Sequence, residues 1–268
     1  MTGDSSQNAQ HISKSIQNIF PYAKVTTPAE IATPQKKSIY IAVGPVALKA
    51  LLSKNIDVPI FTVFTSSLAY KDILSSRPMA QNVTAIYAEP SPSNQLWLAS
   101  MLYRKKITVA VLVSHKTSYL IPLLKQIARQ RDIDLHIERV SEHDNLNKAL
   151  NLITHAQVLL AIPDNTIYQP ENIRHILMTT YRHNQPVIGF TKSLVNAGAL
   201  TTTYSDITDV VEQLREMITQ HEEKQRLPEP QFPKYFKVSI NDAVAKSLNL
   251  LIDEQVRQFS RKPDERSQ

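Results

Sequence analysis

The chain has 268 residues, of which 42% are hydrophobic, and this length and composition suit about two globular domains with sizeable cores. It contains no cysteine, which excludes disulfides, thiolate nucleophiles and thiolate metal sites. The excess of 30 Lys+Arg over 24 Asp+Glu gives a net charge of +6. Apart from a cluster at 104–106, at an expected helix end, the basic residues are scattered. This distribution favours solvated helix faces over a nucleic-acid surface.

No apolar run approaches the ~20 residues that a membrane-spanning helix needs. The first residues, MTGDSSQNAQ, have neither the basic nor the apolar part of a signal peptide. We therefore expect no membrane span, and we expect the signal of an exported protein to be missing from this sequence.

One pattern recurs along the chain: a short apolar strand, a small or polar turn and an amphipathic helix. The first series is expected as a helix at 11–19, strands at 38–43, 59–64 and 82–88, and a helix at 46–53. Two prolines in the run 89–93 enforce extended backbone, which favours a crossing between lobes. Ser93 suits the cap of a helix at 94–103.

A second series of the same pattern follows. Its strands are expected at 107–113, 134–140, 158–162, 186–188 and 199–203, and its helices at 118–130, 144–154 and 171–183. The chain then continues with a helix at 205–223, an extended return connection at 227–235, a strand at 236–240 and a helix at 241–258. Short apolar and β-branched strands of this kind are typical of buried parallel sheets.

This order of elements predicts an α/β fold of two Rossmann-like lobes joined by a hinge. Lobe I is expected to comprise 1–88 and 205–226, lobe II 89–204 and 232–258, and 259–268 a disordered tail. Since no strand precedes the helix at 11–19, we interpret residues 2–7 as the loop after a first strand that the sequence lacks. Such a gap would expose a sheet edge, which could pair between chains or be covered by the N-terminal segment.

Position alone selects a candidate site, because the ligands of open α/β sheets lie outside the carboxyl ends of the strands. Asp164, Asn165 and Thr166 follow the strand at 158–162, and Phe190 and Thr191 follow the strand at 186–188. The alternative is that Asp164 and Asn165 only cap the helix that comes next.

Signals of catalysis are weak in this sequence. The chain has four glycines, and Gly44, Gly189 and Gly198 stand isolated at turns, so neither a P-loop nor a dinucleotide fingerprint is present. The histidines lack zinc-helix spacing, and His115 is interpreted as a surface residue rather than a base. No Ser/His/Asp partnership can be assigned. We expect no enzyme activity, no cofactor and no metal.

Seven motifs, each weak alone, share an order and spacing that together are specific. They are IAVGPVALKAL at 41–51, NVTAIYAEP at 82–90, ITVAVLVS at 107–114, IPDNTIY at 162–168, QPVIGF at 185–190, VNAGALTTTYS at 195–205 and FKVSINDAVAKSLNL at 236–250. Through them the chain resembles the ABC transporter substrate-binding proteins of the type I periplasmic binding fold. It is similar to the branch with tryptophan- and tyrosine-type solute-binding proteins, as a divergent member.

The resemblance implies noncatalytic binding of a small solute, such as an amino acid or an aromatic or carboxylate compound, in an interlobe cleft that closes by hinge motion. Turn hydroxyls and helix N-termini would bind a carboxylate, Asp164 an ammonium group, and aromatic side chains would form walls. The matching positions are Gly44, Pro45, Thr65, Ser66, Ser67, Ser114, Tyr119, Asp164, Asn165, Thr166, Tyr168, Phe190 and Thr191. Tyr168 and Phe190 are the preferred walls, followed by Tyr70 and Tyr119, while most other aromatics are expected in the core.

The partners implied are the solute and either the permease of an ABC transporter or a membrane sensor, and no nucleic acid. The location implied is the periplasm, or the outer side of the cytoplasmic membrane by way of an anchor.

Three departures from the family pattern bear on the ligand. Gly44-Pro45-Val46 replaces the common Gly-Thr-Pro and removes a hydroxyl, and Thr65-Ser66-Ser67 replaces Thr-Asp-Pro and removes a carboxylate. The loop Pro163-Asp164-Asn165 is shorter than the common Pro-Thr-Asp-Asn. Either the ligand differs from an ordinary amino acid or the cleft has lost its transport role. The alternatives are therefore a sensory binding module or an envelope interaction scaffold with a degenerate site.

Overall fold

The computed structural model describes residues 7–27, 30, 38–54, 57–76, 82–103 and 105–263. The chain forms two compact units. Unit 1 comprises Met1–Glu89, Ser205–Phe236 and Arg261–Gln268, and unit 2 comprises Pro90–Tyr204 and Lys237–Ser260. That these units act as two lobes closing on a ligand stays a prediction.

Unit 1 is built on a three-stranded parallel sheet with the order β1-β2-β3. The strands are β1 (Tyr40–Val43), β2 (Ile60–Thr65) and β3 (Val83–Tyr87), and they are connected by α2 (Gly44–Ser53) and α3 (Ser67–Ser75). The return segment at Gln231 adds a parallel bridge to Ile86 at the β3 edge. The carboxyl ends of all three strands therefore meet at one edge of the sheet, where their turns begin.

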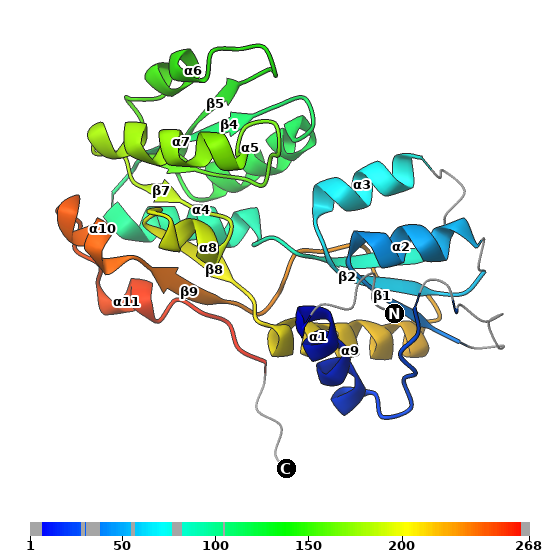
Figure 1. Cartoon of the computed structure of the whole chain (residues 1–268). Coiled ribbons are helices and arrows are strands. Elements are labelled where there is room, and N and C mark those ends of the chain that lie inside the picture. Colours follow the sequence, from blue (N-terminus) through cyan, green and yellow to red (C-terminus); the bar gives the residue numbers. More distant parts are fainter. Residues whose placement is uncertain are drawn as a thin grey trace. The chain divides into compact units, whose positions relative to one another are not determined.

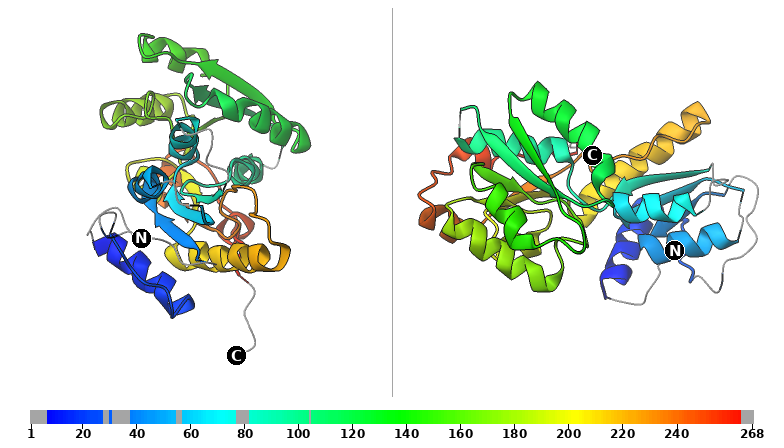
Figure 2. Two further views of the ribbon diagram at one scale, coloured as in Figure 1. Left: turned by 90° about the vertical axis from the view of Figure 1, so that its right-hand side faces the viewer. Right: turned by 90° about the horizontal axis from the view of Figure 1, so that it is seen from above.

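Two helical layers cover this sheet (Figures 1 and 2). On one face α2 and α3 lie side by side and bury an apolar cluster that includes Leu48, Leu51, Ile60 and Ile73. On the other face α1 (Gln7–Ile19) and α9 (Ile207–Lys224) pack together, and Phe61, Val63, Ile86 and Leu214 belong to their cluster. Helix α1 begins at Gln7 rather than near residue 11. The predicted loop at 2–7 lies, up to residue 6, outside the described residues.

The backbone is irregular where β2 ends. Phe64 has a φ of 57°, and the β2–β3 register shifts between Val63 and Thr65. The left-handed region is strained for a bulky residue, and such strain is often found at functional sites. The bulge leaves Thr65 buried, with its Oγ1 2.9 Å from Thr62 Oγ1. It thereby sets the direction in which the following turn leaves the sheet.

Gly44 joins β1 to α2 with a φ of 82°, which favours glycine. A Cβ at this position would meet no atom within 4 Å. We therefore expect Gly44→Ala to lower the free energy of unfolding by about 1 kcal/mol through backbone strain alone. Gly44→Asn should lose less, because asparagine tolerates this conformation better. Urea unfolding measures both, and an alanine variant as stable as the parent would contradict the assignment of strain.

Unit 2 contains a six-stranded sheet with the order β5-β4-β6-β7-β8-β9. Its strands are β4 (Thr108–Val113), β5 (Asp134–Arg139), β6 (Val158–Leu160), β7 (Val187–Ile188), β8 (Thr201–Tyr204) and β9 (Lys237–Ile240). All neighbours pair in parallel except β8 and β9, which are antiparallel. The sequence predicted the last strand but not its reversed direction.

Helices pack on both faces of this sheet. They are α4 (Pro92–Tyr103), η2 (Ser118–Leu120), α5 (Ile121–Gln130), α6 (Leu146–Leu152), α7 (Pro170–Arg182), α8 (Lys192–Asn196), α10 (Asp242–Ser247) and α11 (Glu254–Arg257). Helices α6, α7 and α8 share one buried cluster with Ala110 and Leu112 of β4. The alternate residues Val109 and Val111 are also fully buried and point to the opposite face, the side of α4 and α5.

Several predicted elements are corrected by the structure. The single helix expected at 241–258 is broken into α10 and α11, because Asn249 takes a left-handed φ of 52° after α10 ends. Ser93 lies inside α4 rather than capping it, since this helix begins at Pro92. The tail expected from 259 onward is ordered at its start. Phe259 packs edge-to-face on Trp97, and Phe236 and Arg261 exchange two backbone hydrogen bonds of 2.9 Å.

Candidate functional site

In unit 1 the turn between β2 and α3 presents two serines at the start of the helix. Ser66 caps α3 by accepting a hydrogen bond from the Ala69 amide at 3.1 Å. Ser67 is the first helical residue and is buried. These are the serines for which the sequence predicted carboxylate binding. A carboxylate is indeed bound at this turn, but it belongs to the protein.

Glu89 supplies that carboxylate from the segment after β3. The Ser67 amide donates to both of its oxygens, at 2.9 and 3.1 Å, and the Ser67 hydroxyl donates to Oε1. Glu89 is buried. Burial raises the pKa of Glu89, and the hydrogen bonds from Ser67 oppose that rise. The anion lies at the N-terminus of α3, where the helix dipole favours it.

Unit 2 repeats this arrangement with Asp164, which follows β6. Its Oδ2 accepts from the Ser114 amide at 2.9 Å and the Thr117 hydroxyl at 2.5 Å, and its Oδ1 accepts from the Thr166 amide at 2.9 Å. Asp164 is only 1% exposed. Burial would raise the pKa of Asp164, but these hydrogen bonds outweigh burial and hold it below its usual value. Asp164 thus binds the turn after β4 to the turn after β6.

This geometry excludes the helix-cap interpretation of Asp164. It does not cap α7, because that helix begins at Pro170 with Gln169 at its cap position. Asp164 as the ammonium partner of a solute stays a prediction, and both of its oxygens also accept hydrogen bonds within its own unit. Its observed contacts are those of a buried hub that fixes two strand-end turns.

Two hydroxyls next to this hub are buried without a hydrogen-bond partner among the described residues. They are Thr166 Oγ1 and Tyr168 Oη, on side chains of 9% and 7% exposure. Burial raises the pKa of the Tyr168 phenol, and the nearby Asp164 charge raises it further. The Tyr168 ring packs edge-to-face against Phe190, with centroids 5.6 Å apart. Since buried polar atoms are nearly always satisfied, two such hydroxyls in one loop indicate a place for a polar group.

A buried glutamine holds the neighbouring strand ends. Gln95 of α4 donates to the Gly189 carbonyl at 2.5 Å and contacts Thr202 Oγ1 at 3.1 Å. Its Oε1 accepts from the Thr203 amide at 2.9 Å and the Thr203 hydroxyl at 3.0 Å. Because Gly189 directly precedes Phe190 and Thr191, Gln95 fixes the turn that carries them.

The remaining predicted residues of unit 2 lie around these turns. Ser114 is buried and accepts a hydrogen bond from the Lys116 amide at 3.1 Å. Thr191 is exposed and caps α8 through the Leu194 amide. Asn165 is exposed, and Tyr119 is partly buried in η2. Tyr70, a weaker wall candidate of unit 1, is a core residue whose hydroxyl donates to the Val83 carbonyl at 3.0 Å.

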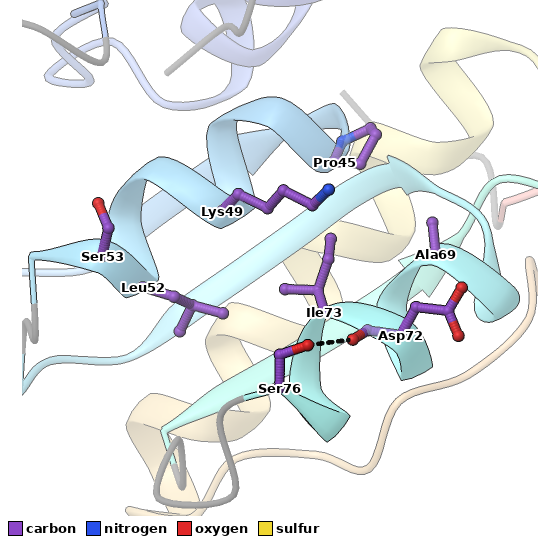
Figure 3. Close-up of a pocket in the computed structure, with 8 residues that line it drawn as sticks. All are labelled: Pro45, Lys49, Leu52, Ser53, Ala69, Asp72, Ile73 and Ser76. Carbon is purple, nitrogen blue, oxygen red and sulfur yellow. Dashed lines mark hydrogen bonds between the residues drawn. The ribbon is translucent and has the colours of Figure 1, made fainter.

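A separate groove of about 750 Å³ lies between α2 and α3 in unit 1 (Figure 3). Pro45 and Ala69 line the end near the strand-end turns, and Ser53 and Ser76 line the other end. Lys49 reaches over the groove from α2, and Asp72 projects from α3. Of the predicted residues only Pro45 contributes to it. Its surface can offer one cation and one anion to a small molecule.

Sequence reasoning missed Glu89, Gln95 and Thr117. Glu89 appeared only as part of the crossing segment, although an acidic residue directly after an apolar strand is a usable signal. Gln95 and Thr117 carry no sequence signal, because their partners come from segments far away along the chain. No group of three His, Asp or Glu side chains that could hold a metal ion occurs within the described ranges.

Two mainly parallel α/β units, each with polar turns at the carboxyl ends of its strands, define the type I periplasmic-binding-protein fold. The chain belongs to the ABC transporter substrate-binding protein family, whose model matches residues 22–263. Membership implies a small-molecule substrate, a membrane transporter as partner and a place outside the cytoplasm. None of the helices that the structure describes is long and apolar enough to span a membrane.

Three solved structures illustrate the fold. One is the ligand-free, open structure of a substrate-binding protein with adhesive properties from Clostridium difficile, at 12% identity over 96% of both chains with a TM-score of 0.69. Another is an ABC domain in complex with L-Trp from Streptococcus pneumoniae, at 17% identity over 96% of both chains with a TM-score of 0.60. The third is a conserved domain protein from Vibrio cholerae, at 19% identity over 94% of this chain and 82% of that chain with a TM-score of 0.58. No curated protein sequence matches the chain significantly.

Proposed function

We propose that this protein is the noncatalytic solute-binding component of an ABC-type transporter and that the strand-end turns of both units hold the solute when a hinge closes. The pair of buried hydroxyls without partners, Thr166 Oγ1 and Tyr168 Oη, carries the proposal. A bound solute would supply the hydrogen bonds that these atoms lack within the described part of the chain. The edge-to-face pair of Tyr168 and Phe190 favours a solute with an aromatic or apolar part.

The proposed partner is the permease of the transporter, which receives the closed, loaded form. The proposed location is the periplasm, or the outer side of the cytoplasmic membrane by way of an anchor. No step of this function requires a catalytic residue or a cofactor.

The alternative is a sensory module or an envelope scaffold with a degenerate ligand site. It is favoured by Gly44-Pro45-Val46, which offers no hydroxyl, and by Glu89 and Asp164, which already occupy turn donors. A sensor would bind a solute but signal to a receptor, whereas a scaffold would bind none. A thermal-shift screen separates a scaffold from the other two functions, because a solute at ~100 times its Kd adds ~2.7 kcal/mol of stability.

The hydroxyl variants Thr166→Val and Tyr168→Phe test where the solute binds. Each removes a buried polar atom that makes no hydrogen bond within the described protein, so the free protein should be as stable as the parent or about 1 kcal/mol more stable. Affinity for a solute found in the screen should fall about tenfold, the effect of losing one hydrogen bond of about 1.4 kcal/mol. Urea unfolding and isothermal titration calorimetry give the two quantities.

Tyr181→Phe is the matched control, because Tyr181 lies exposed on α7 of the same unit. Tyr181→Phe should change neither the stability of the free protein nor its affinity for the solute. If both hydroxyl variants bound the solute as tightly as the parent, the solute would lie elsewhere, and the groove between α2 and α3 would become the first place to search.

A further inference from the structure

The strand β5 forms one end of the unit 2 sheet and pairs with β4 on one side. The two strands keep an unbroken parallel register along the whole of β5, from Asp134 to Arg139. Neither a bulge nor a proline interrupts this strand. An edge of this kind carries a row of N–H and C=O groups to which another strand can add.

The hydrogen bonds at the two ends of β5 show which of its residues face outward. The amides of Asp134 and Val140 donate at 2.9 Å to carbonyls at the two ends of the β4 segment. Because successive residues of a strand direct their backbone groups to opposite sides, the even-numbered residues face β4 and the odd-numbered residues face away. No described strand or isolated bridge pairs with the outward groups of Leu135, Ile137 and Arg139.

Two other sheet ends are bridged by segments of the chain itself. Gln231 bridges Ile86 beside β3, and Arg261 bridges Phe236 just before β9. The side chains of β5 are also less enclosed than those of β4, since residues 135–138 are partly buried whereas residues 109–113 are buried. Helices α5 and α6 contact β5 and belong to the two faces of the sheet, so the edge between those faces is the part of β5 that a further strand would cover.

The side chains of this edge complement one another when two copies of β5 pair antiparallel. A two-fold axis at Ile137 places this residue opposite its own equivalent and His136 opposite Glu138 of the second copy. The outward-facing residues then form the hydrogen-bonded pairs, Ile137 with Ile137 and Leu135 with Arg139. The His136–Glu138 pairs fall at the alternate positions, where opposite side chains lie closest and opposite charges stabilise the pairing.

The imidazole of His136 has an unused hydrogen-bonding atom at this edge. Its Nε2 lies 3.5 Å from Oε2 of Glu138 on the same strand but has no hydrogen-bond partner among the described residues. The two side chains are 34% and 24% exposed, so a second strand can still contact both. Glu138 of the second copy would supply the carboxylate acceptor that His136 lacks, and the symmetry provides this contact twice.

Neighbouring registers lack this complementarity. An axis at His136 would place Glu138 opposite Asp134 of the second copy, and an axis at Glu138 would place the two Glu138 carboxylates opposite each other. Like charges directly opposite are destabilising. An offset of a single residue would set outward-facing residues against residues that face β4, and the ladder could not form.

We propose that two copies of this chain form a symmetric dimer through antiparallel pairing of their β5 strands, with the two-fold axis at Ile137. The pairing joins the unit 2 sheets of both copies into one continuous sheet. It uses no residue of the strand-end turns, so this inference does not rest on the proposed function.

A single introduced thiol tests both the dimer and its register, because the chain contains no cysteine. In Ile137→Cys the two Cα atoms would lie about 5.5 Å apart, which a disulfide can span. Mild oxidation should therefore link most of this variant into covalent dimers. Arg139→Cys is the matched control on the same edge, since its two Cα atoms would lie about 14 Å apart along the strands, too far for a disulfide. Equal linking of both variants, or none in a folded Ile137→Cys variant, would overturn the inference.

Sedimentation velocity on the intact, unsubstituted chain gives the second test. The dimer fraction should rise with protein concentration. His136→Glu sets like charges opposite each other twice and should raise the dimer Kd at least tenfold, whereas the double variant His136→Glu/Glu138→His restores opposite partners and should recover most of the loss.

His183→Glu, an exposed substitution after α7 of the same unit, is the control for this charge change and should leave the dimer Kd unchanged. Circular dichroism checks that each variant is folded. A chain that stays monomeric at every concentration, or a dimer whose Kd is the same in the parent, His136→Glu and the double variant, would overturn the inference.

Discussion

Replacing Asp164 by alanine should lower the free energy of unfolding of unit 2 by about 3 kcal/mol. The substitution leaves the Thr117 hydroxyl and the Thr166 amide without their buried acceptor, while the Ser114 amide keeps only Thr117 Oγ1, at 3.2 Å. Each unsatisfied buried donor costs roughly 1–3 kcal/mol, and partial relaxation of the two turns keeps the total below the sum. Urea unfolding followed by tryptophan fluorescence reports on this unit, because Trp97 of α4 is the single tryptophan of the chain.

The loss of stability caused by Asp164→Ala should depend on pH in a defined direction. The pKa of Asp164 is held below its usual value in the folded state, so its contribution is fully present above the unfolded pKa of about 3.9. The contribution is lost as pH falls through the lower folded pKa. The difference in unfolding free energy between the parent and Asp164→Ala should therefore be constant above about pH 5 and shrink in stronger acid. Asn165→Ala, at the exposed neighbour, is the control, and equal stability of both variants would show that Asp164 is not a hub.

Gln95→Leu should cost unit 2 about 3 kcal/mol and should also weaken solute binding. Leucine fills a similar volume but leaves the Thr203 amide and hydroxyl without the acceptor they have at 2.9 and 3.0 Å. The Gly189 carbonyl loses one donor and keeps the Thr202 hydroxyl at 2.7 Å. Because Gly189 precedes Phe190, the turn that carries this aromatic ring should become less well fixed, and affinity should fall with stability.

The control for Gln95 is Gln126→Leu on α5 of the same unit, where the side chain is exposed. Its unfolding free energy should stay within about 0.5 kcal/mol of the parent. Urea unfolding and calorimetric titration of the same samples separate the two effects. A Gln95→Leu variant with full stability would mean that Gln95 does not hold the strand ends.

The strands of both sheets could be predicted because their signal is local. β4 and β6 are short runs of β-branched and apolar residues that end in polar turns, and this pattern is typical of buried parallel strands. The turns at Ser66, Ser114 and Asp164 could be placed at the carboxyl edges of the sheets for the same reason. The family motifs then made the α/β class specific.

Features that depend on distant partners could not be predicted. The break between α10 and α11 depends on left-handed Asn249, and the apolar positions on either side still follow one helical pattern. The short helix α8 carries too few residues for a periodic signal. The antiparallel direction of β9 depends on its pairing with β8, which local sequence does not encode.

In the candidate site too, features with a local sequence signal could be predicted and features that depend on distant partners could not. The sequence predicted Ser67 and Asp164 as solute-binding residues, with a helix cap as the alternative for Asp164. It did not predict their partners, Glu89 and the Ser114–Thr117 turn, because the fold brings these in from other segments. Strand-end donors that look free in the sequence are satisfied inside the protein. Beside Asp164, the described residues leave the hydroxyls of Thr166 and Tyr168 for a ligand, and each can donate or accept a hydrogen bond.

A crystal structure of the protein with the tightest-binding solute from the thermal-shift screen is the most direct test of the proposed function. We expect a polar group of the solute to lie within hydrogen-bond distance of the Thr166 or Tyr168 hydroxyl. A solute bound instead in the groove between α2 and α3 would contradict the proposal.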